Sequence, residues 1–267
     1  MKAQAARAVA SVRCWVLSVA VIAAVAGPAH PLWSQSRETV AIRGHQQSVY
    51  VYGNPQGEPI IVSSGDGGWI HLGPHVAEFL ASRGFFVMGF DVKVYLSSFT
   101  SERSTLRPDD EPADYRVLTE LAKKRTGRKP ILIGVSEGAG LSVLAGTDPD
   151  TKADVSGVIG LGLPDLNELG WRWKDSLIYL THKPPNEPAF SATTVVRGLA
   201  PLPIALLQST HDEFVPLAET QRIFAQASEP KRLWVIDAVN HRFSNNLPEF
   251  DTRLMEAIAW VQHNQPR

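Results

Sequence analysis

Short apolar runs alternate with amphipathic stretches along most of the chain. Continuous apolar runs, expected for strands buried on both faces of a sheet, occupy 59–63, 85–90, 131–133, 155–161, 203–208 and 232–236. Helical spacing predicts helices over 72–82, 113–125, 218–227 and 253–261. Runs at 39–42 and 48–52 predict an edge hairpin, whereas 93–112 is polar and is expected to be irregular. This alternation predicts an α/β protein with a doubly wound, mostly parallel sheet.

The first 29 residues have the pattern of a secretory signal peptide. Lys2, Arg7 and Arg13 form a positive start, 14–26 is apolar, and 27–29 supplies small residues for cleavage. We therefore expect a periplasmic or secreted protein whose mature part, residues 30–267, is one domain. A leader that is kept as a membrane anchor is the alternative interpretation.

Composition excludes several classes of function. The formal net charge of −1 gives no electrostatic reason to expect a nucleic-acid partner. Cys14 is the only cysteine and lies in the leader, so the mature domain has neither a disulfide nor a thiolate metal site. The histidines lack a ligand spacing such as H-E-x-x-H, and we expect no metal and no cofactor. Nothing in the sequence predicts an oligomeric state.

The stretch with the clearest chemistry is 134–138, which reads Gly-Val-Ser-Glu-Gly. It follows a buried apolar run and precedes small residues that can open a helix. A G-x-S-x-G between strand and helix is typical of a nucleophile elbow, in which a strained turn exposes the serine hydroxyl. We therefore predict that Ser136 is a nucleophile. The alternative is a serine in a tight turn that has no chemical role.

Partners for this serine follow later strands. Asp212 comes just after 203–208 and His241 just after 232–236, which gives the chain order Ser, Asp, His of an α/β-hydrolase triad. His241 would take the Ser136 proton, and Asp212 would orient the imidazole and stabilise its charged form.

Other residues could fill these two roles. Asp165 and Asp237 each follow a predicted strand and are rival acids, although Asp212 has the better context. His211 is a rival base, but its place beside Asp212 makes a useful geometry hard to form.

The segment 64–69, Ser-Gly-Asp-Gly-Gly-Trp, lies between a predicted strand and a predicted helix. It lacks both the P-loop lysine and the G-x-G-x-x-G spacing of phosphate cradles. We expect it to supply one oxyanion donor from the backbone N–H of Asp66, with the second from Glu137. The carboxylates of Asp66 and Glu137 would then flank the reacting carbonyl, where they could bind a cationic group. The alternative is that both point to solvent or make structural hydrogen bonds.

Residues 163–200 interrupt the alternation of strand and helix. This insertion is long for a plain connection and carries Trp171, Trp173, Tyr179 and Phe190. A lid over the site and a structural cap with buried aromatic residues are both consistent with it.

The sequence resembles the α/β-hydrolase domain of the bacterial virulence protein VirJ and its AcvB relatives over about 58–265. The resemblance rests on 64–69, the strand that ends at Asp91, Tyr95, and the G-x-S-x-G with Ala139. It implies a periplasmic enzyme that hydrolyses lysyl-phosphatidylglycerol, with Asp66, Glu137, Trp69 and Tyr95 beside the substrate. Glu137 departs from the aromatic residue usual in the family, and the segment after Tyr95 lacks the expected tryptophan.

The function expected from these observations is an exported serine hydrolase that acts on an aminoacyl ester lipid. Its partner would be a lipid headgroup reached through transient contact with a membrane surface. A hydrolase of small soluble esters or peptides is the first alternative. A non-enzymatic periplasmic accessory protein is the second.

Overall fold

The computed structural model describes residues 35–172 and 187–266, which fall within one compact unit, Trp33–Arg267. The predicted leader, Trp173 and Tyr179 lie outside the described residues. In the described ranges, no helix is both long and apolar enough to span a membrane.

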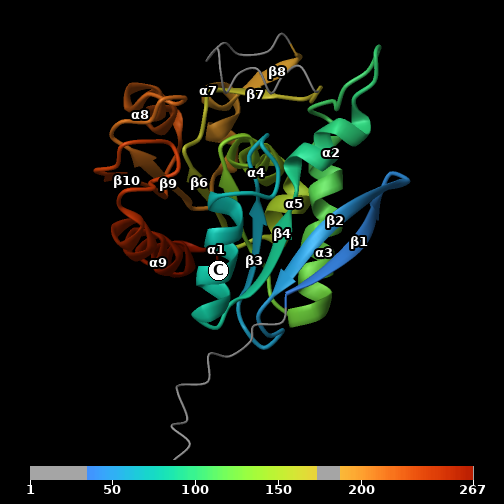
Figure 1. Cartoon of the computed structure of the whole chain (residues 1–267), viewed down its shortest axis with the longest axis horizontal. Coiled ribbons are helices and arrows are strands. Elements are labelled where there is room, and N and C mark those ends of the chain that lie inside the picture. Colours follow the sequence, from blue (N-terminus) through green and yellow to red (C-terminus); the bar gives the residue numbers. More distant parts are fainter. Residues whose placement is uncertain (1–34, 173–186, 267) are drawn as a thin grey trace, which may run out of the picture. The chain divides into compact units, whose positions relative to one another are not determined.

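An eight-stranded sheet forms the centre of this unit (Figure 1). Its spatial order is β1-β2-β4-β3-β5-β6-β9-β10. The first two strands are antiparallel to their neighbours, and the remaining six are parallel to one another. The strands are β1 (Ser36–Ile42), β2 (His45–Tyr52), β3 (Pro59–Ser63), β4 (Phe86–Phe90), β5 (Ile131–Val135), β6 (Gly157–Leu161), β9 (Ile204–Ser209) and β10 (Lys231–Ile236).

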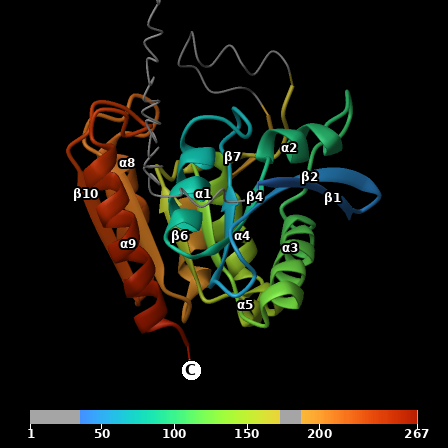
Figure 2. The ribbon, with the colours of Figure 1, turned by 60° about the horizontal axis from the view of Figure 1, so that its bottom comes forward.

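Helices cover both faces of the sheet, as a doubly wound α/β fold requires. The apolar side chains of α1 (Leu72–Ser82) and α9 (Leu247–Asn264) share one core cluster. Those of α3 (Glu111–Thr126), α4 (Glu137–Thr147) and α8 (Leu217–Gln226) belong to the cluster on the other face. Figure 2 shows α9 alongside β10 at one end of the sheet and α3 towards β1 and β2 at the other.

Alternation along the central strands explains why their apolar runs are continuous. In β5, Ile131 and Ile133 point into the α1/α9 cluster while Leu132 points into the other. Burying each such side chain stabilises the fold by about 1.5–3 kcal/mol. The parallel strands also bring their carboxyl ends to one edge, where Ser63 pairs with Gly134 and Val135 with Leu161. In open α/β sheets, ligands bind beside this edge.

Most predicted elements form close to their expected bounds, and the predicted fold is confirmed. The prediction that 93–112 is irregular is wrong for its first part, because α2 (Val92–Phe99) forms there. Asp91 caps this helix by accepting the N–H of Val94 (3.1 Å). A short helix, α5 (Pro149–Asp154), was not predicted.

The insertion at 163–200 contains a small hairpin and two short helical segments in its described part. Strands β7 (Leu166–Glu168) and β8 (Ala189–Ser191) pair in antiparallel fashion. They are followed by α7 (Ala192–Val195) and the 3₁₀ helix η2 (Val196–Leu199). Phe190 is buried in the core, as the interpretation of a structural cap expects. Whether the insertion acts as a lid stays a prediction.

Candidate active site

Ser136 occupies a strained turn between β5 and α4. Its backbone has φ 51° and ψ −118°, a conformation that favours glycine and costs a residue with a side chain about 1–3 kcal/mol. Small residues let the strand and helix approach around it: a Cβ on Gly134 would lie 2.1 Å from the carbonyl oxygen of Gly138. The predicted elbow geometry is therefore present, and Ser136 lies at the carboxyl edge of the sheet.

The loop between β3 and α1 passes directly beside this serine. A Cβ on Gly65 would lie 3.3 Å from the Cβ of Ser136, so a glycine at this position allows the close approach. Asp91 anchors the loop by accepting the N–H of Trp69 (3.3 Å). Glu137 is the first residue of α4, so its N–H has no acceptor within the helix. Asp66 and Glu137 both line the pocket that contains Ser136, as expected of oxyanion donors.

His241 lines the same pocket and forms a close pair with Asp212, whose side chain is buried. Nδ1 of His241 lies 2.6 Å from Oδ2 of Asp212. The other carboxylate oxygen, Oδ1, accepts the N–H groups of Phe214 (2.9 Å) and Val215 (2.8 Å). Burial would raise the pKa of Asp212, but its hydrogen bond to His241 and these N–H donors outweigh burial and lower it. Asp212 is therefore held as a carboxylate that fixes the orientation of the imidazole.

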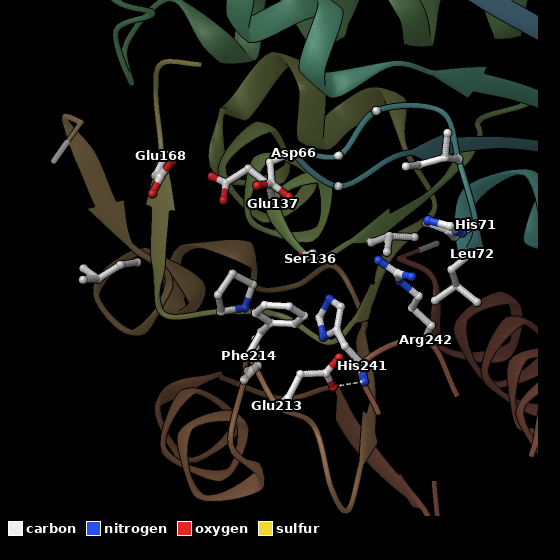
Figure 3. Close-up of a pocket in the computed structure, with 18 of the residues that line it drawn as sticks. Asp66, His71, Leu72, Ser136, Glu137, Glu168, Glu213, Phe214, His241 and Arg242 are labelled. Atoms are coloured by element: carbon white, nitrogen blue, oxygen red, sulfur yellow. Dashed lines mark hydrogen bonds between the residues drawn. The ribbon is translucent and has the colours of Figure 1, made fainter. Parts of the chain in front are cut away.

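The far nitrogen of the His241 ring faces Ser136 (Figure 3). Nε2 is buried and has no hydrogen-bond partner in the part of the chain that the structure describes. Figure 3 shows the ring directed towards Ser136. An orphaned buried acceptor is costly unless a reaction uses it. Catalytic hydrogen bonds are often long in the absence of substrate, and this arrangement suits a base that takes the serine proton.

The rival residues have other partners. Asp165 lines the pocket, but it accepts the hydroxyl of Ser191 (2.7 Å) and the N–H of Thr193 (2.8 Å) within the insertion. Asp237 accepts the hydroxyl of Thr210 (3.1 Å) and does not line the pocket. His211 also bonds to Thr210 and stays outside. Of the three carboxylates considered, the structure brings only Asp212 to His241.

Gly162, a residue that the sequence reasoning missed, sits against this pair at the end of β6. Its φ is +60°, and a Cβ there would lie 2.5 Å from Cε1 and 2.9 Å from Nδ1 of His241. The absence of a side chain at 162 therefore leaves room for the imidazole. Phe214 packs edge-on against the other side of the ring, at 5.7 Å between centroids.

Ser136 and His241 open into a cavity of about 400 Å³, large enough for a small substrate or a headgroup. Its walls differ in charge (Figure 3). Asp66, Glu137 and Glu168 lie together on one side, while His71 and Arg242 lie on the opposite side.

We call the side formed by Asp66, Glu137 and Glu168 the carboxylate wall. Glu137 is its most deeply buried side chain. Glu137 is only 7% exposed, and its Oε1 has no hydrogen-bond partner among the described residues. Burial raises the pKa of the Glu137 carboxyl well above its ordinary value, and the charges of Glu168 and Asp66 raise it further. The described residues contain no group of His, Cys, Asp or Glu arranged to hold a metal ion. Carboxyl groups on one wall of a cavity can accept hydrogen bonds from a cationic group.

Glu168 was also missed from the sequence, whereas two predicted substrate contacts require correction. Trp69 stacks on Tyr50 (5.0 Å between centroids) and donates its indole N–H to Tyr52 (3.2 Å), outside the pocket. Tyr95 is fully buried and donates its hydroxyl to Asp114 (2.6 Å). Both side chains therefore belong to the scaffold, and neither lines the pocket.

The sheet order, the elbow at its carboxyl edge and the flanking helices define an α/β-hydrolase fold. Solved structures with this fold include an esterase from Pyrococcus furiosus, which is 17% identical, with 85% of this chain and 91% of that chain covered (TM-score 0.65). A dienelactone hydrolase from Anabaena variabilis is 15% identical, with 85% and 97% covered (TM-score 0.62). A membrane phospholipase A described as a bacterial virulence factor is 11% identical, with 85% and 87% covered (TM-score 0.62).

The sequence itself points to a narrower group. Residues 59–168 match the family model described as bacterial virulence protein (VirJ), so the resemblance to the VirJ family is confirmed over this range. The match includes the 64–69 loop, Ser136 and all three residues of the carboxylate wall. Comparison with curated proteins finds no match.

Proposed function

We propose that this protein is an exported serine hydrolase that cleaves an ester whose acyl group carries an ammonium ion. An aminoacyl ester of a lipid headgroup, such as lysyl-phosphatidylglycerol, is the substrate class that the VirJ resemblance favours. The observation that carries this proposal is the carboxylate wall beside Ser136, in which Glu137 keeps a buried oxygen without a partner.

The reaction follows from the placement of the side chains. Ser136 Oγ attacks the ester carbonyl while Nε2 of His241 takes its proton, and Asp212 stabilises the imidazolium. The N–H groups of Asp66 and Glu137 donate to the oxyanion of the tetrahedral intermediate. Collapse of the intermediate breaks the bond to the alcohol, which leaves with the proton from His241. A water molecule, deprotonated by His241, then hydrolyses the acyl-enzyme and restores Ser136.

Recognition of the acyl group depends on the protonation of Glu137. With the pocket empty, its raised pKa favours the neutral acid, because burial disfavours the carboxylate and the neighbouring Glu168 and Asp66 add to this effect. An ammonium ion between these side chains reverses that balance, because its positive charge favours the carboxylate, and Glu137 releases its proton to solvent. The pocket therefore accepts a cation without burying an unpaired negative charge in its absence.

The predicted leader and the rim of the pocket support a membrane-facing location. Ile70 and Leu166 line the pocket, yet their side chains are 52% and 61% exposed. Apolar side chains around an open cavity can contact a lipid surface from which a headgroup enters. The proposed place of action is therefore the periplasm or the cell exterior, in transient contact with the membrane.

A substrate comparison tests this function. Lysyl and hexanoyl esters of the same alcohol differ in charge at similar length, and the wild-type protein should prefer the lysyl ester. Because a hydrogen bond to a charged group contributes about 1.5–3 kcal/mol, Glu137→Gln should lower this preference by about tenfold to a hundredfold. Glu120→Gln, on the exposed face of α3, makes the same charge change far from the site and should leave the preference unaltered.

Two outcomes would contradict the proposal. If Ser136→Ala hydrolyses these esters as fast as the wild-type protein, Ser136 is not the nucleophile. If wild type and Glu137→Gln show the same ratio of kcat/KM for the two esters, the carboxylate wall does not recognise the acyl cation. A small soluble ester would then be the better substrate class.

A further inference from the structure

Arg242 places a guanidinium without an ion-pair partner, among the residues that the structure describes, at the pocket itself. Of the residues described, it is the one arginine or lysine that lines the pocket, and its guanidinium makes no hydrogen bond or ion pair with any of them. Other arginines of the fold are paired: Arg43 with Asp114, Arg116 with Asp148 and Arg125 with Glu38. An unpaired guanidinium in an otherwise acidic cavity indicates a binding role that the proposed chemistry has not used.

His71 lies beside Arg242 and is held in a strained conformation. Its φ of 57° and ψ of −114° nearly match those of Ser136 (51° and −118°). Such backbone outliers concentrate at functional sites, because the surrounding structure must compensate for their cost. Burial, followed by the charge of the nearby Arg242, lowers the pKa of His71.

The position of these residues relative to His241 identifies the part of the substrate that they face. The leaving oxygen must come within hydrogen-bond reach of Nε2 of His241, because that atom returns the proton. Arg242 is the next residue along the chain, and its guanidinium lies on the side of the site away from Glu137 and Glu168 (Figure 3). With the acyl cation at the carboxylate wall, the alcohol extends towards Arg242 and His71.

We propose that Arg242 and His71 form an anion subsite that binds a phosphodiester in the leaving alcohol. This inference rests on the proposed function and extends it to the second half of the substrate. The guanidinium and the imidazole supply N–H donors that match phosphate oxygens. The first turn of α1, which begins just after His71, contains no acidic residue to oppose an anion there.

The charges of the cavity then select one orientation of the substrate. Besides the carboxylate wall, Asp165, Glu213 and Glu219 also line the cavity, so an anion is repelled everywhere except near Arg242. The Glu213 carboxylate accepts a hydrogen bond from the backbone N–H of His241 (2.8 Å). A substrate that is cationic in its acyl group and anionic in its alcohol therefore fits in one direction, with its ester at Ser136.

The test compares two soluble lysyl esters, one of glycerol and one of glycerophosphoglycerol. The measured quantity is the ratio of their kcat/KM values, with the phosphodiester ester expected to be preferred. Because Arg242 is exposed to water, Arg242→Gln should lower this ratio by about tenfold rather than more. Arg83→Gln is the matched control, since Arg83 lies at the opposite end of α1 and gives the same change in net charge.

His71→Gly provides a second variant that avoids a folding defect. Glycine adopts a positive φ without strain, so this change removes the imidazole while it preserves the backbone. We expect a smaller fall in the ratio and no loss of thermal stability. Binding of glycerophosphoglycerol to the Ser136→Ala protein, measured by calorimetry, should weaken in the Ser136→Ala/Arg242→Gln double variant.

The outcomes separate this inference from the proposed function. If neither lysyl ester is hydrolysed, the proposed function fails and the calorimetry alone decides the anion subsite. If both are hydrolysed but Arg242→Gln and Arg83→Gln give the wild-type ratio, the anion subsite is refuted and the function stands. Lysyl-phosphatidylglycerol in vesicles distinguishes the source of the phosphodiester, because a lipid-specific site would prefer it to the soluble ester.

Discussion

Replacement of Gly162 by alanine should disable the site while the fold persists. The new Cβ would lie 2.5 Å from Cε1 of His241, whereas carbon atoms ordinarily approach to about 3.5–4.0 Å. The imidazole must therefore move by about 1 Å, away from Ser136 or away from Asp212. A displacement of that size costs about 100-fold in rate where a reaction depends on alignment. We expect kcat/KM of Gly162→Ala to fall by about this factor.

The same substitution carries a backbone cost that a control must remove. Alanine in a left-handed conformation costs about 1–2 kcal/mol, so the melting temperature should fall by about 2–8 °C. Gly127 also has a positive φ, 72°, but a Cβ there would have no atom within 4 Å. Gly127→Ala should therefore lose similar stability and keep its activity.

The assay is steady-state hydrolysis of the best ester from the substrate comparison, together with thermal unfolding of each variant. In a His241→Ala background, Gly162→Ala should have no further effect on rate, because the displaced group is already gone. The reasoning is refuted if Gly162→Ala keeps the wild-type kcat/KM. It is also refuted if Gly127→Ala loses as much activity, since the loss would then come from the fold.

Two further predictions follow from the buried carboxyl groups. Asp212→Asn should lower kcat by about 10⁴-fold because it spoils the tautomer of His241. Asp165→Asn, at the rival acid, should have a much smaller effect, and the reverse ranking in kinetic assays would move the acid. Burial, then Asp114 and Asp148, raises the pKa of the fully buried Glu111 well above its ordinary value, so the folded state keeps a proton that the unfolded state releases. Stability should therefore fall as the pH rises above about 4.5, by about 1.4 kcal/mol per unit until the folded-state pKa is reached. Urea unfolding from pH 5 to 8 should show that Glu111→Gln removes this slope and that Glu120→Gln keeps it; equal slopes in both variants would contradict the reasoning.

The sequence was sufficient to predict the sheet and the elbow because both depend on local patterns. Apolar runs between turn residues marked the central strands, and helix α1 formed over the predicted 72–82. The order of Ser136, Asp212 and His241 followed from their places after strands, since parallel strands bring such loops to one edge. Helix α2 was not recognised because it is short, and its buried face of Val92, Tyr95 and Leu96 carries no long helical pattern.

The direction of side chains could not be inferred in the same way. Tyr95 and Trp69 were predicted to contact the substrate, yet neither side chain lines the pocket. The polar atoms of both form hydrogen bonds within the scaffold instead. Glu168 lies on a strand whose partner is more than 20 residues away, at Ala189–Ser191, so no local signal placed it beside Glu137. The sequence shows that Arg242 follows His241. It does not show that the guanidinium lacks an ion-pair partner among the described residues, because that depends on the positions of the surrounding carboxylates.

The pocket is assembled from two separate stretches of the chain, and this division affects how related proteins should be compared. The proposed acyl side, with Asp66, Glu137 and Glu168, belongs to 59–168, the range of the family match, and so does His71, whereas His241 and Arg242 lie beyond it. Under the proposed function, a substitution of Arg242 would change which alcohol is released while the acyl side stays the same. The residue after the histidine should therefore be compared before a shared substrate is assigned to proteins that match over the earlier stretch alone.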